Sequence, residues 1–299
     1  MTFRKIVYMG IGLAMASGSP VQTKALTGLK DEISFYVLVK SANYAQDAEG
    51  TLKFLNNHMF SEIFIGEGVT LTGAQLTRPD APDQPINYVR REKTYYVEGG
   101  HFDSEAELDQ AYPNGTFTFD IQLPNRDIRS EMLLAGPEGE TDIPDPIVIS
   151  LYQDGQKMRA DALDPGKKLT VRWSAYSNGR SDPKGIVDDM IFVVMADCHG
   201  ERIIHTGLPF QGPYTKYTET EISVDAAFLK TGHPYSMFVE FPHVVDSNIT
   251  DGVPGFTSFA TATYLDVKTL GPDTSASCPA DKIPMDTGQT DRMEDDAVQ

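Results

Sequence analysis

Six histidines are the residues best suited to bind a metal or move a proton: His58, His101, His199, His205, His233 and His243. Metal sites usually show histidine pairs at i and i+4 on a helix, or at i and i+2 on a strand. No pair among the six has either spacing. Cys198, His199 and His205 share one predicted hairpin and form the best metal candidate. That cysteine is better explained by a disulfide, so the sequence predicts no metal and no cofactor.

Acid–base and nucleophilic chemistry has no distinct motif either. The chain lacks the Gly-x-Ser-x-Gly pattern of hydrolase serines and the glycine-rich loops that hold phosphates. His101 lies close to Asp103 and Glu105, which suits a cation or proton transfer and equally suits an exposed histidine before a helix. Asp188 and Asp189 are the first candidates among the many carboxylates for a catalytic pair in glycoside hydrolysis. The alternative is that they are solvent-exposed residues at the start of a strand.

Aromatic residues in two predicted loops are the candidate ligand-binding residues. Exposed rings on loops at the end of a β-sandwich suit the binding of a sugar or a peptide. Folding of the same rings onto the core is the alternative. The rings are Phe210, Tyr214 and Tyr217 in residues 208–217, and Phe256 and Phe259 in residues 246–259.

These residues must be positioned by β-strands, because apolar residues alternate with polar ones along most of the chain. Residues 33–39 and 117–123 show the pattern, with one buried and one wet face. One short helix is expected over 103–111, since Ser104 and Glu107 have the spacing of a capping box and Pro113 follows. We interpret it as a crossover in a first sandwich, with a linker over residues 136–146 after it.

The second half contains seven short predicted strands separated by turns, which indicates a Greek-key sandwich. Residues 169–173 alternate and end on the only tryptophan, Trp173, and Leu229, Gly232 and Tyr235 follow later. This half resembles a fibronectin type III domain. The resemblance implies a buried Trp173 and a Tyr235 hydroxyl bonded back to the main chain. It implies a fold and no activity.

The N-terminus has the layout of a secretory signal peptide. Arg4 and Lys5 precede a short apolar stretch over residues 6–16, and small residues follow. Cleavage after Ala16 or after Ala25 fits, and Ala25 is preferred because the strand pattern begins soon after it. The protein is therefore expected to be secreted or periplasmic. In an oxidising compartment Cys198 and Cys278 are expected to form a disulfide; two independent thiols are the alternative.

The formal net charge of −18 argues against nucleic acid as a partner. No apolar run after the N-terminus is long enough to cross a membrane. We therefore expect an all-β protein of two tandem sandwich domains, with a signal peptide (1–25), an N-terminal β-sandwich carrying the crossover helix (26–143), a fibronectin type III-like domain (144–270) and a disordered acidic tail (271–299).

The expected function is an exported, non-enzymatic binding or structural protein that engages an extracellular glycan or protein through loops at a sandwich end. The alternative is a secreted carbohydrate-active or other hydrolytic enzyme that uses carboxylates.

Overall fold

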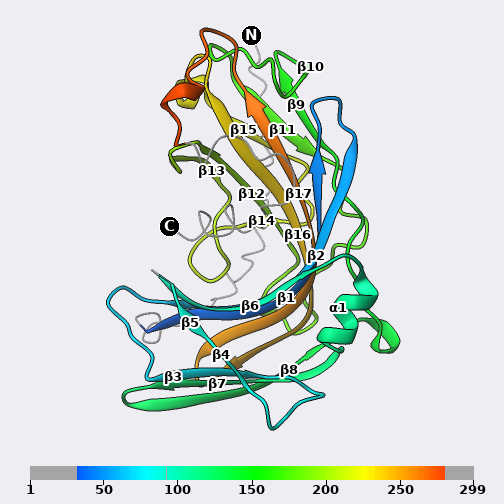
Figure 1. Cartoon of the computed structure of the whole chain (residues 1–299), viewed down its shortest axis with the longest axis vertical. Helices are drawn as coiled ribbons and strands as arrows, with labels where there is room; N and C mark the ends of the chain where they lie inside the picture. Colours follow the sequence, from blue (N-terminus) through cyan, green and yellow to red (C-terminus); the bar gives the residue numbers. More distant parts are fainter. Residues whose placement is uncertain (1–31, 92, 280–299) are drawn as a thin grey trace, which may run out of the picture.

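The computed structural model describes residues 32–91 and 93–279. These residues form an all-β fold with one short α-helix, which confirms the expected fold class. Two sandwich-like arms meet at a bend in a set of long strands (Figure 1). The predicted signal peptide and residues 280–299 of the predicted tail lie outside the described residues.

A nine-stranded sheet runs through both arms in the order β13-β12-β16-β17-β1-β2-β6-β5, with β14 paired to β12. Its strands are β1 (Ile33–Gln46), β2 (Leu52–Ile65), β5 (Val89–Arg90), β6 (Thr94–Phe102), β12 (Met190–Asp197), β13 (Arg202–His205), β14 (Thr215–Lys216), β16 (Pro234–Thr250) and β17 (Val253–Lys268). The first four belong to the first half of the chain and the other five to the second.

The two halves of the chain are joined in this sheet by β1 and β17. These strands pair in parallel from Tyr36 opposite Gly255 to Gln46 opposite Leu265. All the other described pairings in the sheet are antiparallel. Parallel partners far apart in sequence leave no local signal, so the period-two pattern could not reveal this junction. The domain boundary between residues 143 and 144 stays a prediction.

In the upper arm of Figure 1, a four-stranded sheet of order β10-β9-β11-β15 faces the end of the large sheet formed by β13, β12, β16 and β17. Its strands are β9 (Ile149–Gln153), β10 (Gln156–Met158), β11 (Leu169–Trp173) and β15 (Glu221–Val224). Trp173 and Tyr235 are buried in the core between the two sheets. The backbone N–H of Lys230 donates to the Tyr235 hydroxyl over 2.6 Å, so this side chain is bonded back to the main chain.

In the lower arm, a second four-stranded sheet of order β4-β3-β7-β8 packs against the other end of the large sheet. Its strands are β3 (Gly73–Thr77), β4 (Ile86–Asn87), β7 (Gly115–Leu123) and β8 (Arg126–Leu134). Phe117 and Phe119 of β7 are fully buried in this core, as their alternation predicted. The Tyr36 ring of β1 meets the Phe119 ring at 5.0 Å and fixes the two sheets together.

Helix α1 (Glu105–Ala111) precedes β7 and confirms the predicted short helix. The Ser104 side chain caps it by accepting from the Glu107 N–H, and Glu107 accepts from the Asp103 N–H. These two bonds satisfy N–H groups at the helix start. Three short 3-10 turns complete the elements: Pro137–Gly139, Ala226–Phe228 and Ser275–Ser277. No described helix is long and apolar enough to span a membrane.

Residues 246–259, predicted as an aromatic loop, instead form the ends of β16 and β17 and the tight turn between them, so that prediction was wrong. The turn itself uses only Asp251 and Gly252, which both have positive φ as the hairpin turn requires. Gly255 lies within β17, and a larger residue would not fit there because its Cβ would collide with the Tyr36 ring. The glycine that suggested a loop therefore serves close packing.

Candidate functional site on the concave sheet face

The two faces of the nine-stranded sheet have different roles. On β17, Phe259 and Leu265 point to the face that both sandwich cores cover. Phe256 and Tyr264, an odd number of residues away, point to the opposite face, because side chains alternate along a strand. We call this opposite face, on the inner side of the bend in Figure 1, the concave face. The wet face expected for residues 33–39 is therefore wrong: Tyr36 and Leu38 are buried on one face of β1 and Val37 on the other, because β1 is a central strand covered on both sides.

A groove on the concave face is lined mainly by apolar side chains and encloses a cavity of about 110 Å³. Its aromatic lining residues come from six strands: Phe35, Phe60, Phe64, Tyr96, Phe192, Phe238, Phe256 and Tyr264. The Phe35 ring stacks on Phe64 with centroids 4.1 Å apart and lies 6.3 Å from Phe256. Neighbouring strands thus hold the rings in rows, an arrangement that only the assembled sheet provides.

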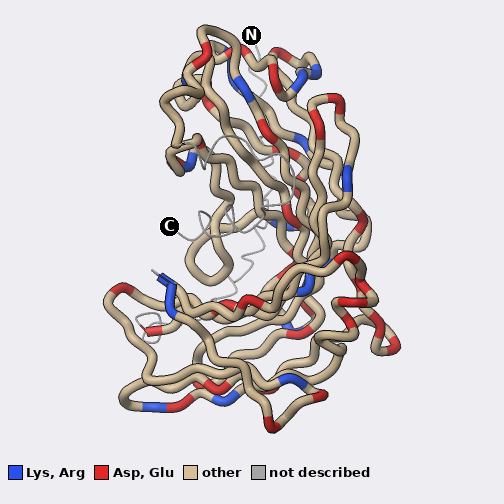
Figure 2. Tube along the Cα trace, viewed as in Figure 1, with Lys and Arg blue, Asp and Glu red and all other residues tan. Residues whose placement is uncertain are grey.

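A second cavity of about 510 Å³ adjoins the groove, and both are lined by Phe64, His205 and Leu208. Lys93 and Arg202 also line the second cavity, and none of the described residues that line it is acidic. Figure 2 shows basic segments on both sides of the concave face, at the turn between β5 and β6 and on β13, on an otherwise acidic chain.

His205 is held as a neutral hydrogen-bond acceptor between the two cavities. Burial and the positive charge of Arg202 lower the pKa of its imidazole below the ordinary 6.5. The Gly207 N–H donates to its Nδ1 over 3.1 Å, which requires that nitrogen to be unprotonated. The fixed positive charge of the second cavity therefore comes from Lys93 and Arg202.

The five aromatic residues singled out in the sequence do not form one site. Phe210, Tyr214 and Phe256 come together in the apolar cluster on the concave face, where the Phe210 ring lies 5.7 Å from Phe35. Tyr217 packs against the upper core, and Phe259 is fully buried in the lower core. Only Phe256 lines the groove directly. Ligand binding by these residues stays a prediction.

Asp188 and Asp189 both have hydrogen-bond or ion-pair partners within the fold, so their carboxylates have a structural role. Asp189 is buried and accepts from the Val244 N–H, the Arg180 N–H and His243 Nδ1 at 2.8–2.9 Å. Asp188 forms an ion pair with Lys216 at 2.8 Å. These bonds tie the segment just before β12 to β16 and to β14, so the pair has the geometry of a structural anchor.

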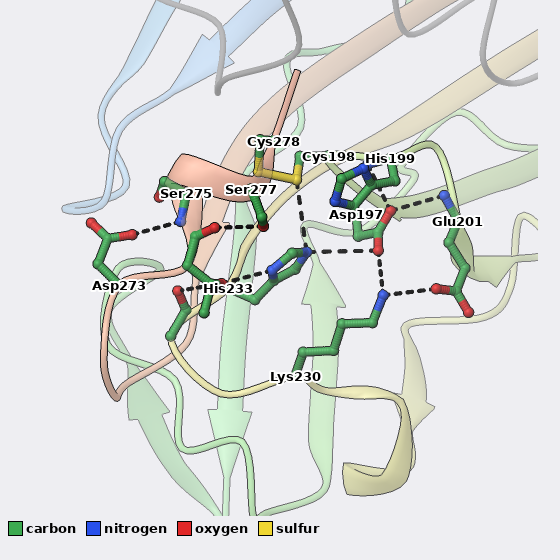
Figure 3. Close-up of a disulfide and its surroundings, with 12 residues drawn as sticks. Asp197, Cys198, His199, Glu201, Lys230, His233, Asp273, Ser275, Ser277 and Cys278 are labelled. Atoms are coloured by element: carbon green, nitrogen blue, oxygen red, sulfur yellow. Dashed lines mark hydrogen bonds and ion pairs between the residues drawn. A yellow bond between two sulfur atoms is a disulfide. The ribbon is translucent and has the colours of Figure 1, made fainter. Parts of the chain in front are cut away.

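Cys198 and Cys278 form the expected disulfide, which is confirmed across 80 residues of sequence. His233 lies between this bridge and Asp197, with its Nε2 3.8 Å from the Cys198 sulfur and 3.6 Å from the Asp197 carboxylate (Figure 3). Its Nδ1 lies 2.9 Å from the Thr274 hydroxyl. Residues 271–279 of the predicted tail are thereby bound to the upper sandwich.

Because Cys198 is in the disulfide, its sulfur cannot serve as a thiolate ligand in the metal candidate that the sequence offered. His199 lies beside His233, with ring centroids 6.3 Å apart, whereas His205 lines the groove. Cys198, His199 and His205 therefore form no metal-binding group among the described residues.

A different group, His58, Glu98 and His101, meets the geometric requirement for a metal site in the described part of the chain. Its candidate ligand atoms all lie within 4.8 Å of one another. His58 Nε2 is 2.7 Å from a Glu98 oxygen, and the His58 and His101 rings stack with centroids 4.3 Å apart. His58 is fully buried, while the other two residues are exposed.

The electrostatics of this group favour an ionised Glu98. Burial alone would raise the pKa of this carboxyl, but the His58 hydrogen bond and charge, the Gly100 N–H and His101 together lower it. Arg91 lies 3.9 Å from the second oxygen of Glu98 and stacks over the Tyr96 ring at 3.7 Å. Because His58 also stacks on Phe60 at 5.3 Å, the group adjoins the aromatic groove.

The sequence analysis missed this group because its members do not share a standard spacing. The one available signal was the Gly99-Gly100 pair between Glu98 and His101. Two glycines inside an alternating strand suggest a β-bulge, which changes the faces to which the flanking residues point. The long-range partner, His58, could come only from the fold.

Comparisons with known proteins add little to this description. No family model matches the chain, and no curated protein matches it. A solved structure titled "Biofilm associated protein - BSP domain" is 14% identical, with a TM-score of 0.19, over 79% of this chain. The match covers 29% of that chain, so the present chain spans less than a third of its length. A likeness at this level carries no argument about fold or function.

Proposed function

We propose that this is an exported, non-enzymatic binding protein whose ligand lies in the aromatic groove of the concave face. One observation carries the proposal: the apolar groove and the basic cavity share Phe64, His205 and Leu208 as lining residues. A ligand that follows both would have an apolar body and an anionic end. A fatty acid, or a similar chain with a carboxylate, has this chemistry.

The composition of the groove favours such a ligand over a glycan. Sugars need many polar partners around each ring, whereas this lining is mostly aliphatic and aromatic, with a few charged groups. The site proposed here therefore lies on the sheet face and not on the sandwich-end loops. Export is supported by the sequence layout of residues 1–25 and is compatible with the Cys198–Cys278 bridge.

We also propose that the upper arm is a fibronectin type III-like sandwich. The proposal is supported by the strand order β10-β9-β11-β15 facing β13-β12-β16-β17, by the buried Trp173 and by the bond from the Lys230 N–H to Tyr235. The long ends of β16 and β17, which continue into the lower arm, would then be extensions of that sandwich.

The ligand proposal is tested by fluorescence titration with cis-parinaric acid and its uncharged methyl ester. Truncating Phe60 or Phe192 to Ala removes apolar contact and is expected to weaken both probes about tenfold, since one large apolar contact contributes about 1.5 kcal/mol or more. Lys93→Gln and Arg202→Gln should weaken only the acid. Phe228→Ala and Lys157→Gln, at exposed positions outside the groove, are the matched controls.

Two results would contradict the proposal. The first is the absence of saturable binding of either probe by the folded wild-type chain. The second is equal affinity of wild type and the Phe60 and Phe192 variants, with circular dichroism showing that all are folded.

A hydrolytic enzyme is the second candidate function, because Glu62 and Glu240 both line the groove. Two carboxylates facing one bound substrate are the minimal set for acid–base hydrolysis. The candidate is tested with a panel of nitrophenyl esters and glycosides. Turnover that Glu62→Gln or Glu240→Gln abolishes would favour the enzyme over the binding protein.

A further inference from the structure

We propose that His58, Glu98 and His101 form a binding site for one divalent transition-metal ion of the Zn²⁺ class. The inference is independent of the groove ligand, because it rests on the donor set and on the backbone that brings the three residues together. Two imidazole nitrogens and one carboxylate oxygen are a donor set that proteins use for Zn²⁺, Fe²⁺ and related ions.

A bulge in β6 builds the site. Glu98 pairs with Phe60 and His101 pairs with His58, so three steps along β6 match two steps along β2. In a regular strand, residues three apart point to opposite faces. The extra residue restores Glu98 and His101 to the same face, directly opposite a buried histidine.

The two glycines of the bulge are required by its geometry. Gly100 has φ +93°, a conformation that side chains rarely adopt. At Gly99 an added Cβ would lie 2.6 Å from the Met59 carbonyl oxygen, well inside contact distance. A strand interior that holds two consecutive glycines loses packing and stability. Here their effect is to place three metal-ligating side chains together.

The three candidate ligand atoms lie close to the spacing that one metal ion requires. Ligand atoms at the usual 2.0–2.1 Å from tetrahedral zinc lie about 3.3 Å from one another. The described ligand atoms are within 4.8 Å, with the His58–Glu98 pair already at 2.7 Å. Three protein ligands leave the fourth position of a tetrahedral ion for water or for an anionic group.

The test is metal binding by the untagged, chelator-treated chain, measured by calorimetry with Zn²⁺ and by Co²⁺ absorption. Wild type is expected to bind one equivalent in the presence of millimolar Mg²⁺, which competes for ordinary carboxylate clusters. His101→Ala and Glu98→Gln alter exposed side chains and should each weaken binding at least tenfold. His199→Ala and Glu131→Gln, exposed residues outside the cluster, should bind as wild type does.

The Co²⁺ spectrum reports the ligands of the bound ion directly, so it tests the proposal even where a variant is less stable than wild type. Nitrogen ligation gives visible bands that must diminish in His101→Ala and persist in His199→Ala. The proposal is overturned if wild type binds neither ion more tightly than millimolar. It is also overturned if folded His101→Ala and Glu98→Gln bind Zn²⁺ with wild-type affinity.

Discussion

Removal of the Cys198–Cys278 disulfide is expected to destabilise the upper sandwich strongly. The bridge closes a loop of 80 residues that contains β13 to β17. In the chain-entropy treatment, a closed loop of this length restricts the unfolded chain enough to stabilise the fold by about 4.5 kcal/mol at 25 °C. Chains of this size lose roughly 2–4 °C in melting temperature per kcal/mol, so a fall of roughly 10 °C is expected.

The assay uses the single tryptophan as its reporter. Trp173 is buried in the same sandwich, and its indole N–H donates to the Glu219 carbonyl, so its emission reports unfolding of the core that the bridge closes. Urea unfolding is followed for wild type, for wild type with reductant, and for the double variant Cys198→Ser, Cys278→Ser. Reduced wild type and the double variant should agree, because both lack only the bridge.

The loop-entropy argument fails under either of two results. One is a loss of less than about 1 kcal/mol on reduction, which would mean that closing this loop does not restrict the unfolded chain as the chain-entropy treatment assumes. The other is a further loss when reductant is added to the double variant, which has no disulfide to reduce.

Two other substitutions test local features. Tyr235→Phe leaves the Lys230 N–H without its acceptor and should lower the free energy of unfolding by about 1–2 kcal/mol, as measured by urea titration; an unchanged midpoint would contradict the role given to this bond. The pKa of His205 is lowered in the folded state by burial and Arg202, so its contribution to stability is present above pH 6.5 and is lost as the pH falls through the folded-state pKa. Wild type should therefore lose more stability than His205→Gln between pH 7.5 and pH 5, because protonation of Nδ1 breaks the Gly207 bond. Parallel pH curves for the two proteins would refute this assignment.

Local patterns in the sequence were sufficient to predict strands, the helix and some of the buried residues. Alternation placed Phe117 and Phe119 on the buried face of a strand, and the Ser104–Glu107 spacing located the only α-helix among the described residues. These signals work because side-chain direction and helix capping depend on neighbours within a few residues. The Cys198–Cys278 pairing was also accessible, since the chain has only two cysteines.

The groove on the concave face could not be predicted from such local patterns. Phe256 was singled out for its aromatic ring, but its place beside Phe35 and Phe64 depends on the parallel pairing of β1 with β17. Glycines and prolines near it suggested a loop, whereas Gly255 is needed for contact with Tyr36. A residue type that serves both turns and close packing cannot by itself show which role it has.

By itself, the sequence determined an all-β chain with one capped helix, and it favoured one disulfide; the resemblance to fibronectin type III domains implied the buried Trp173 and the bond from Tyr235 back to the main chain. Only the tertiary structure decided that both halves share one bent sheet, that its concave face carries a row of aromatic rings, and that His58 meets Glu98 and His101. The physical reason is range: strand faces and caps are set by adjacent residues, whereas strand partners and bulges are set by contacts between segments far apart in the chain.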